Sequence, residues 1–181
     1  MISYERLVEA KKHYSECGYK YIEVPWEVEH KVEKITKPKN LKSYKLNSGR
    51  LVASGEQGFL QLMKDGTLPT GSFQCITPCF RDEVVDAIHA PYFMKLELIK
   101  TINPSRLTLN NIIEDAQKFF SRYVECKVVE TGDFMYDIVS EKTNIELGSY
   151  GLRQHNLVGN WVYGTGLAEP RLSYVIENNK G

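Results

Sequence analysis

Two stretches in the middle of the chain, residues 72–80 and 91–99, are rich in apolar, β-branched and aromatic residues, and the second alternates apolar with polar positions. This pattern predicts two strands, and the short polar segment between them predicts a hairpin. Side chains two positions apart on an extended strand point to the same face. We therefore expect Arg81 and Glu83, at the mouth of the hairpin, to face one shared volume.

The rest of the chain shows helical and strand patterns. Apolar residues recur at helical spacing in residues 3–16, 59–64, 103–125 and 170–178. Short strand patterns occupy residues 19–24, 51–54, 127–129, 133–139, 144–147 and 161–163. We expect Asn103 to cap the third helix, because asparagine is a favoured N-cap and Pro104 suits a first turn. Together, these helix and strand patterns predict an α+β fold with an antiparallel β-sheet flanked by helices.

The balance of positive and negative residues limits how the protein could bind nucleic acid. Lys+Arg and Asp+Glu total 23 each, so the formal net charge is zero. A domain that binds nucleic acid on its own is usually basic, so an RNA partner would need a local patch. The one basic run, residues 30–50, is either a solvated loop or a surface that faces RNA or phosphate.

Length, cysteine content and hydropathy indicate a compact protein of the cytoplasm. A chain of 181 residues has room for one substantial core. Its four cysteines indicate reduced thiols, and their spacing is poor for zinc. No apolar run reaches the ~20 residues of a membrane span. We expect a cytoplasmic protein with no membrane partner.

Residues at the mouth of the hairpin suit a nucleotide. Arg81 can meet a phosphate with a planar fork of donors, Phe93 offers a flat face to a purine, and His89 adds a second possible phosphate contact. The stretch resembles the second signature motif of class II aminoacyl-tRNA synthetases, through the order Phe80-Arg81-x-Glu83, His89-x-x-x-Phe93 and Glu97.

Two other stretches resemble the remaining signature motifs, in the same order along the chain. Residues 18–26 resemble the first motif, with the pattern Gly18-Tyr19-x-x-Ile22-x-x-Pro25-Trp26. Residues 164–172 resemble the third, with the sequence Gly164-Thr165-Gly166-Leu167-Ala168-Glu169-Pro170-Arg171-Leu172. The third departs at two positions: Ala168 replaces a glycine, and Pro170 replaces the acid that usually precedes the arginine. The added methyl group and the first-turn proline are both compatible with ATP binding.

Residues 146–153 add an acid, Glu146, and a hydroxyl, Ser149, three positions apart. Both suit a magnesium-phosphate site, because hard cations prefer oxygen ligands. The stretch resembles the aspartate/asparagine branch of class II, and also ammonia-dependent asparagine synthetase, which shares that fold.

The resemblance implies one class II synthetase-like catalytic domain over residues 1–181, without an anticodon-binding domain. It implies an ATP-dependent ligase that makes an aminoacyl-adenylate from an aspartate- or asparagine-like acid. The implied ATP site consists of Arg81, Glu83, His89, Phe93, Gly164, Gly166 and Arg171, with Arg81, Glu83 and Arg171 as the catalytic residues. In it, Phe93 stacks under adenine against Arg171.

The resemblance also implies that Glu146 and Ser149 hold Mg2+ and that residues 3–26 form a homodimer interface. The implied amino-acid pocket consists of Ser54, Glu56, Gln57, Glu97 and Arg153. A cluster such as Ser54, Glu56 and Gln57 suits an ammonium group. Arg153 would read the side-chain carboxylate or carboxamide of the substrate, or else pair with Glu97 or Glu146.

Three readings of function stay open. The leading one is the ligase, whose acceptor could be tRNA, ammonia, another small amine or a protein side chain. A second is a catalytically inactive synthetase-like binding or regulatory module; the retained charges at Arg81, Glu146 and Arg171 oppose it. A third is a nucleic-acid accessory protein that uses the lysines between Lys31 and Lys45.

Overall fold

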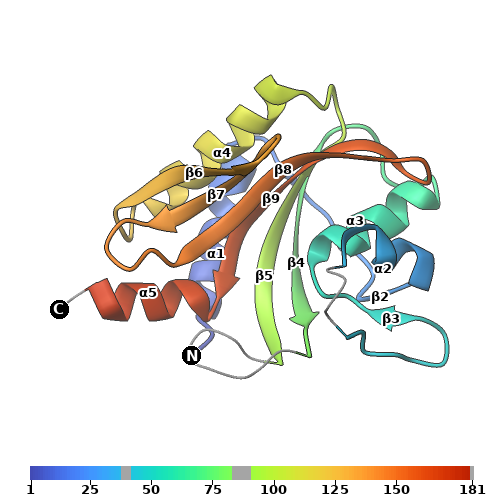
Figure 1. Cartoon of the computed structure of the whole chain (residues 1–181), viewed down its shortest axis with the longest axis horizontal. Coiled ribbons are helices and arrows are strands. Elements are labelled where there is room, and N and C mark those ends of the chain that lie inside the picture. Colours follow the sequence, from blue (N-terminus) through green and yellow to red (C-terminus); the bar gives the residue numbers. More distant parts are fainter. Residues whose placement is uncertain (38–41, 83–90, 180–181) are drawn as a thin grey trace.

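The computed structural model describes residues 1–37, 42–82 and 91–179. Its centre is a seven-stranded sheet in the order β1-β4-β5-β9-β8-β7-β6 (Figure 1). The strands are β1 (Lys20–Tyr21), β4 (Ser72–Phe80), β5 (Tyr92–Lys100), β6 (Cys126–Gly132), β7 (Met135–Ser140), β8 (Glu146–His155) and β9 (Gly159–Glu169). Only β1 pairs in parallel, with β4; the other neighbours are antiparallel. The predicted α+β class, the antiparallel sheet and the central hairpin are confirmed.

One face of the sheet is covered by helices α1 (Tyr4–Glu16) and α4 (Arg106–Phe120) (Figure 1). Each begins at a serine: Ser3 accepts a hydrogen bond from the Arg6 amide, and Ser105 accepts one from the Thr108 amide. These N-caps satisfy amides that a helix start leaves without partners. The expected cap Asn103 is wrong; it lies before the helix with a positive φ of 44°.

The other face is only partly covered. Helix α2 (His30–Thr36), helix α3 (Gly55–Lys64) and the two-stranded sheet β2 (Glu27–Val28) and β3 (Arg50–Leu51) lie beside β4 and β5. A second core joins them to the large sheet, through Val28, Val32, Phe59, Leu60, Phe73, Ile99 and Trp161. No helix of the described residues covers the part of this face between α3 and β8, and the candidate site lies there.

Several elements differ in extent from the sequence prediction. The strand expected at 19–24 pairs only over Lys20–Tyr21, whereas β8 and β9 are longer than predicted because each pairs with strands on both sides. Helix α3 begins at Gly55 rather than near Phe59. A β-carbon at Gly55 would lie 2.9 Å from Cys75 Sγ, so glycine lets the helix start press against β4.

The last element of the described residues is helix α5 (Arg171–Asn179), which begins two residues after the end of β9. The four cysteines are free. No helix within the described ranges is long and apolar enough to cross a membrane.

Candidate active site

An open cavity of about 220 Å³ lies on the partly covered face of the sheet. Eight of the residues predicted from the sequence line it: Ser54, Glu56, Gln57, Arg81, Glu97, Glu146, Ser149 and Arg153. They come from the start of α3, the residue after β4, the middle of β5 and three positions along β8. Segments that lie far apart in the sequence therefore converge on one volume.

Glu56 and Arg153 bind each other across this cavity. Arg153 Nη1 donates to both carboxylate oxygens of Glu56, at 2.9 and 2.7 Å. Trp161 Nε1 donates to the same carboxylate at 2.8 Å, and the Arg153 guanidinium lies 3.9 Å from the centre of the Tyr163 ring. Within the described residues, the acid that pairs with Arg153 is thus Glu56, and not Glu97 or Glu146 as in the alternative that the sequence left open.

A second charged pair lies deeper. Glu97 is only 2% exposed and forms an ion pair with Lys95, its neighbour on the same face of β5. Burial raises the pKa of the Glu97 carboxyl above its ordinary value, and the Lys95 charge partly offsets this rise. The Lys95 ammonium contacts Oε1 of Glu97, so this buried carboxylate has a charged donor beside it.

Gln57 and Ser54 contribute differently from each other. The Gln57 side chain accepts a hydrogen bond from the Ala53 amide at 2.8 Å and donates one to the Glu33 carbonyl at 3.3 Å. It thus fastens α2 to the start of α3, and both ends of its amide are used by the backbone. Ser54 occupies the N-cap position of α3 but makes no capping hydrogen bond with its side chain.

Arg81 marks the outer end of the cavity. Its Nε donates to the Ala53 carbonyl at 3.1 Å, and its guanidinium lies 5.0 Å from the centre of the Phe93 ring. The two residues expected to hold α-phosphate and adenine are therefore adjacent. The stacking of adenine between Phe93 and Arg171 stays a prediction. Glu83 and His89, also predicted for the ATP site, lie outside the described residues.

Arg171 opens helix α5 and pairs with Glu146 across 3.1 Å. Sequence reasoning missed a third member of this group, Asp137, which lies opposite Ser149 in the β7–β8 register. Burial and the nearby Glu146 carboxylate raise the pKa of Asp137. Only the pairing of β7 with β8 brings Asp137 here, and no spacing along the chain signals it.

The oxygen groups of Asp137, Glu146 and Ser149 are the donors that Mg2+ prefers. In the described part of the chain, no group of three His, Cys, Asp or Glu side chains could hold a metal by itself. This donor set fits a magnesium ion held by one or two carboxylates and completed by substrate phosphates, which is how Mg2+ is usually bound.

Solved structures with the same arrangement of elements carry synthetase names. Two structures of the pyrrolysyl-tRNA synthetase of Desulfitobacterium hafniense match 96% of this chain at 17% identity, with TM-scores of 0.76 and 0.71, and the match covers 68% and 69% of those chains. The cytoplasmic serine-tRNA ligase of Naegleria fowleri, in complex with AMP, matches 97% of this chain at 17% identity with a TM-score of 0.77. This chain has the catalytic fold of class II aminoacyl-tRNA synthetases. It spans 48% of the serine-tRNA ligase chain.

The likeness is one of structure. No protein family and no curated protein matches the sequence. The resemblance to class II synthetases is thus confirmed at the level of the fold, and the aspartate/asparagine branch is a matter for proposal.

Gly164 and Gly166, both predicted for the ATP site, belong to the strand that precedes α5. Both lie inside β9. A β-carbon at Gly164 would come within 2.7 Å of the Tyr150 ring, and one at Gly166 within 2.4 Å of Leu96 and 2.7 Å of Tyr14. The two glycines make room for core side chains on the face covered by α1 and α4. Their predicted contact with ATP stays a prediction.

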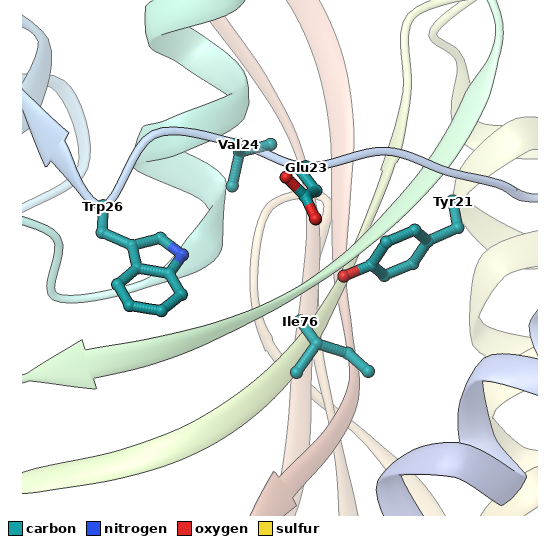
Figure 2. Close-up of a pocket in the computed structure, with 5 residues that line it drawn as sticks. All are labelled: Tyr21, Glu23, Val24, Trp26 and Ile76. Atoms are coloured by element: carbon teal, nitrogen blue, oxygen red, sulfur yellow. The ribbon is translucent and has the colours of Figure 1, made fainter.

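The segment predicted as a dimer interface is divided between core and surface. Leu7 and Tyr14 of α1 are buried in the chain's own core, whereas Tyr4, Val8 and Trp26 are 66%, 66% and 55% exposed. A second hollow of about 400 Å³ lies at this edge of the sheet, with Trp26 and Tyr21 on either side of Glu23 and with Ile76 of β4 below them (Figure 2).

Proposed function

We propose that this protein is an ATP-dependent ligase that activates a small amino acid of the aspartate/asparagine type as its aminoacyl-adenylate. The observation that carries the proposal is the convergence of eight predicted residues on one cavity in a class II synthetase fold. The structural neighbours are named as synthetases, and one of them is a complex with AMP.

Formation of an aminoacyl-adenylate requires alignment of the reacting groups and stabilisation of the developing charge. A carboxylate that attacks the α-phosphate of ATP needs the reacting groups held in line and the developing charge neutralised, and little acid-base help. In this proposal Arg81 holds the substrate carboxylate and the α-phosphate at the outer end of the cavity, and Phe93 beside it stacks with adenine.

Arg171 is the second cationic group of the proposal and contacts the outer phosphates. Its ion pair with Glu146 holds it at the rim of the cavity before a nucleotide binds. Glu146, Ser149 and Asp137 would hold Mg2+, which when bound neutralises phosphate charge. Glu83 and His89 keep their predicted roles toward adenine and the outer phosphates.

The amino-acid end of the site consists of the pairs Glu56–Arg153 and Lys95–Glu97. The assignment to an aspartate/asparagine-like substrate rests on residues 146–153, whose order resembles that branch. The acceptor could be tRNA, ammonia, a small amine or a protein side chain. We also propose that residues 1–181 work as one catalytic unit and that two copies associate through the exposed residues of segment 3–26.

The alternative is a synthetase-like module that binds without catalysis. The specific observation in its favour is that Glu56 and Arg153, both expected to bind the amino acid, neutralise each other.

Amino-acid-dependent exchange of pyrophosphate into ATP, screened over the common amino acids, separates the two. The ligase predicts exchange with at least one of them. Exchange with none would leave the binding module as the function.

A further inference from the structure

Lys95 lines the candidate active site but is not among the residues that the sequence predicts for it. It borders the same cavity as the eight predicted residues, and its side chain is 14% exposed. Lysine is rarely buried to this extent without a partner or a task. Its place in the middle of β5 therefore calls for a physical reason.

The cavity face of β5 presents Phe93, Lys95 and Glu97 in turn, because side chains two positions apart share a face of a strand. A rise of about 3.3 Å per residue separates such neighbours by roughly 7 Å. In the proposed function, Phe93 stacks with adenine and Glu97 belongs to the amino-acid end. Lys95 thus lies between these two parts, where the α-phosphate and the substrate carboxylate meet. The strands on both sides of β5 carry short side chains opposite Lys95. Thr77 of β4 and Ala168 of β9 are its cross-strand partners, and such partners lie on the same face of a sheet. Neither side chain is long enough to cover the Lys95 ammonium. From this row across the sheet, Lys95 is therefore the group that reaches the reacting atoms.

Glu97 holds the Lys95 ammonium in this position through their ion pair. An ammonium group carries three N–H donors, and contact with one carboxylate oxygen uses one of them. The charges of Lys95 and Arg81 also act on the same buried group. Burial raises the pKa of the Cys79 thiol to about 11, and both of these charges oppose the rise. Two cations that act on one buried group form a positive region, which attracts anionic ligands.

Stability alone does not account for the Lys95–Glu97 pair. Removing two charges from water costs about as much as their attraction returns, so a buried ion pair often stabilises a fold no better than uncharged side chains of similar size. Charged groups gathered in a cavity are instead typical of functional sites. The pair is thus better explained by what Lys95 does toward a ligand.

We propose that Lys95 is a catalytic residue of adenylate formation, whose ammonium contacts the amino-acid carboxylate and the α-phosphate of ATP as they meet, and that Glu97 positions it. This inference rests on the proposed function. A carboxylate oxygen forms a bond to the α-phosphorus, the bond from that phosphorus to the oxygen bridging to the β-phosphate breaks, and pyrophosphate leaves with the electron pair. No proton moves in this step, so Lys95 stays charged. Its charge offsets the repulsion between two anionic groups and the negative charge that gathers on the α-phosphate oxygens.

The test is pyrophosphate exchange by the full chain, with the amino acid that the wild type accepts best. The double variant Lys95→Met/Glu97→Gln removes both charges at once, so no buried carboxylate is left unpaired. We expect kcat to fall by at least about a hundredfold, the scale for one preorganised charged donor, with a smaller change in KM. The midpoint of urea denaturation should stay close to that of the wild type, which a merely structural role of the pair would not allow.

Two further variants make the result specific to the charge at this position. Lys95→Arg keeps a positive charge and should exchange at least roughly tenfold faster than the double variant. Lys100→Met is the matched control, because Lys100 lies on the same strand but on the opposite face, with its ammonium 4.8 Å from the centre of the Tyr19 ring. It should exchange at the wild-type rate.

Near-normal exchange by the folded double variant would overturn this inference and leave the proposed function in place. An equal loss of exchange in Lys100→Met would also overturn it, since the effect would then not depend on the cavity. If the double variant does not fold, Lys95→Gln, whose amide can still donate to Glu97, carries the same expectation. A wild type that shows no exchange with any amino acid would overturn both the proposed function and this inference.

Discussion

Arg81 and Arg171 stand at two ends of the candidate site, and each is held by contacts that a nucleotide could replace or extend. Arg81 donates to a backbone carbonyl and stacks near Phe93, while Arg171 pairs with the half-exposed Glu146. Charge-stabilising donors held in place before the reaction lose little energy to reorganisation, which is why they contribute strongly to catalysis.

Replacing either arginine should therefore abolish most activity. We predict that Arg81→Ala and Arg171→Ala each lower pyrophosphate exchange by at least about a hundredfold, the scale observed when one preorganised donor is removed. Arg106→Ala, an exposed arginine at the start of α4, is the matched control and should exchange at the normal rate. Near-normal exchange in Arg81→Ala or Arg171→Ala would contradict the assignment of the site.

We expect the Glu56–Arg153 ion pair to contribute to the stability of the fold. In Arg153→Leu, the Glu56 carboxylate, which is 5% exposed, would keep only the Trp161 hydrogen bond. Stranding a fully buried charge costs about 3–5 kcal/mol; because the Arg153 side chain is 32% exposed, we expect a loss of about 2 kcal/mol of unfolding free energy.

The double variant Arg153→Leu/Glu56→Gln removes the stranded charge and should recover most of this loss. Urea denaturation of the wild type, both single variants and the double variant measures the coupling between the two residues. Additive effects, with no recovery in the double variant, would show that the pair does not stabilise the fold.

At the residue scale, the sequence predicted most of the residues that line the site, but not how they are brought together. Eight predicted residues line the cavity, three of them at the start of α3 and five on or just after the strands β4, β5 and β8. Asp137 was missed because only strand pairing places it beside Ser149. Nothing in the sequence indicated that Gly164 also makes room for the Tyr150 ring, because glycine patterns look alike whether they leave space for a ligand or for a core side chain.

Among the described helices, α2 is the one that the sequence patterns do not predict. Its segment is rich in lysine and was read as a solvated loop or an RNA-facing surface. The helix buries little beyond Val32 and Glu33, too few positions for a recognisable period. What holds it in place is contact with α3, which no local pattern encodes.

Part of that contact is electrostatic and depends on pH. The Glu29 carboxylate, at the N-cap position of α2, is bound by Lys64 of α3, by Lys31 and by Gln61. These interactions, Lys64 first, lower the pKa of Glu29 from its ordinary 4.5 to about 2. The charged form is therefore favoured by folding, so its stabilising effect is complete above about pH 4.5 and disappears as the pH falls toward 2.

We predict that Glu29→Gln lowers the melting temperature at pH 7 and that the difference from the wild type shrinks between pH 4.5 and pH 2. The effect should also diminish in high salt, because the Glu29 side chain is 43% exposed and screening weakens such pairs. Glu125→Gln, an exposed glutamate after α4, is the control. A difference that stays constant across this pH range would rule out the Glu29 charge as its cause.

For the whole molecule, the fold class followed from the sequence because strand alternation, helical periods and short connections all agreed. The division of α1 into a buried and an exposed side could not be read in the same way. Leu7 and Tyr14 share a helical stripe with Tyr4 and Lys11, and only the position of α1 against the sheet decides that Leu7 and Tyr14 are the core members.

The exposed residues of segment 3–26 lead to the prediction of a homodimer. Tyr4, Val8 and Trp26 leave apolar area in water, and Figure 2 shows Trp26 at the margin of the 400 Å³ hollow. Apolar surface of this kind is usually buried against a partner. We predict a dimeric mass by light scattering at micromolar concentration, and a monomeric mass for Val8→Glu and for Trp26→Ala.

Leu107→Glu provides the contrast, because Leu107 is 70% exposed, close to the 66% of Val8, but lies on α4. It should remain dimeric, which would show that the segment 3–26 surface, and not exposed apolar area in general, drives association. Trp26 also supplies an independent signal: the chain's other tryptophan, Trp161, is fully buried, so a change of fluorescence on dilution reports on Trp26. A monomeric wild type, or a dimer that survives both Val8→Glu and Trp26→Ala, would place any association elsewhere on the molecule.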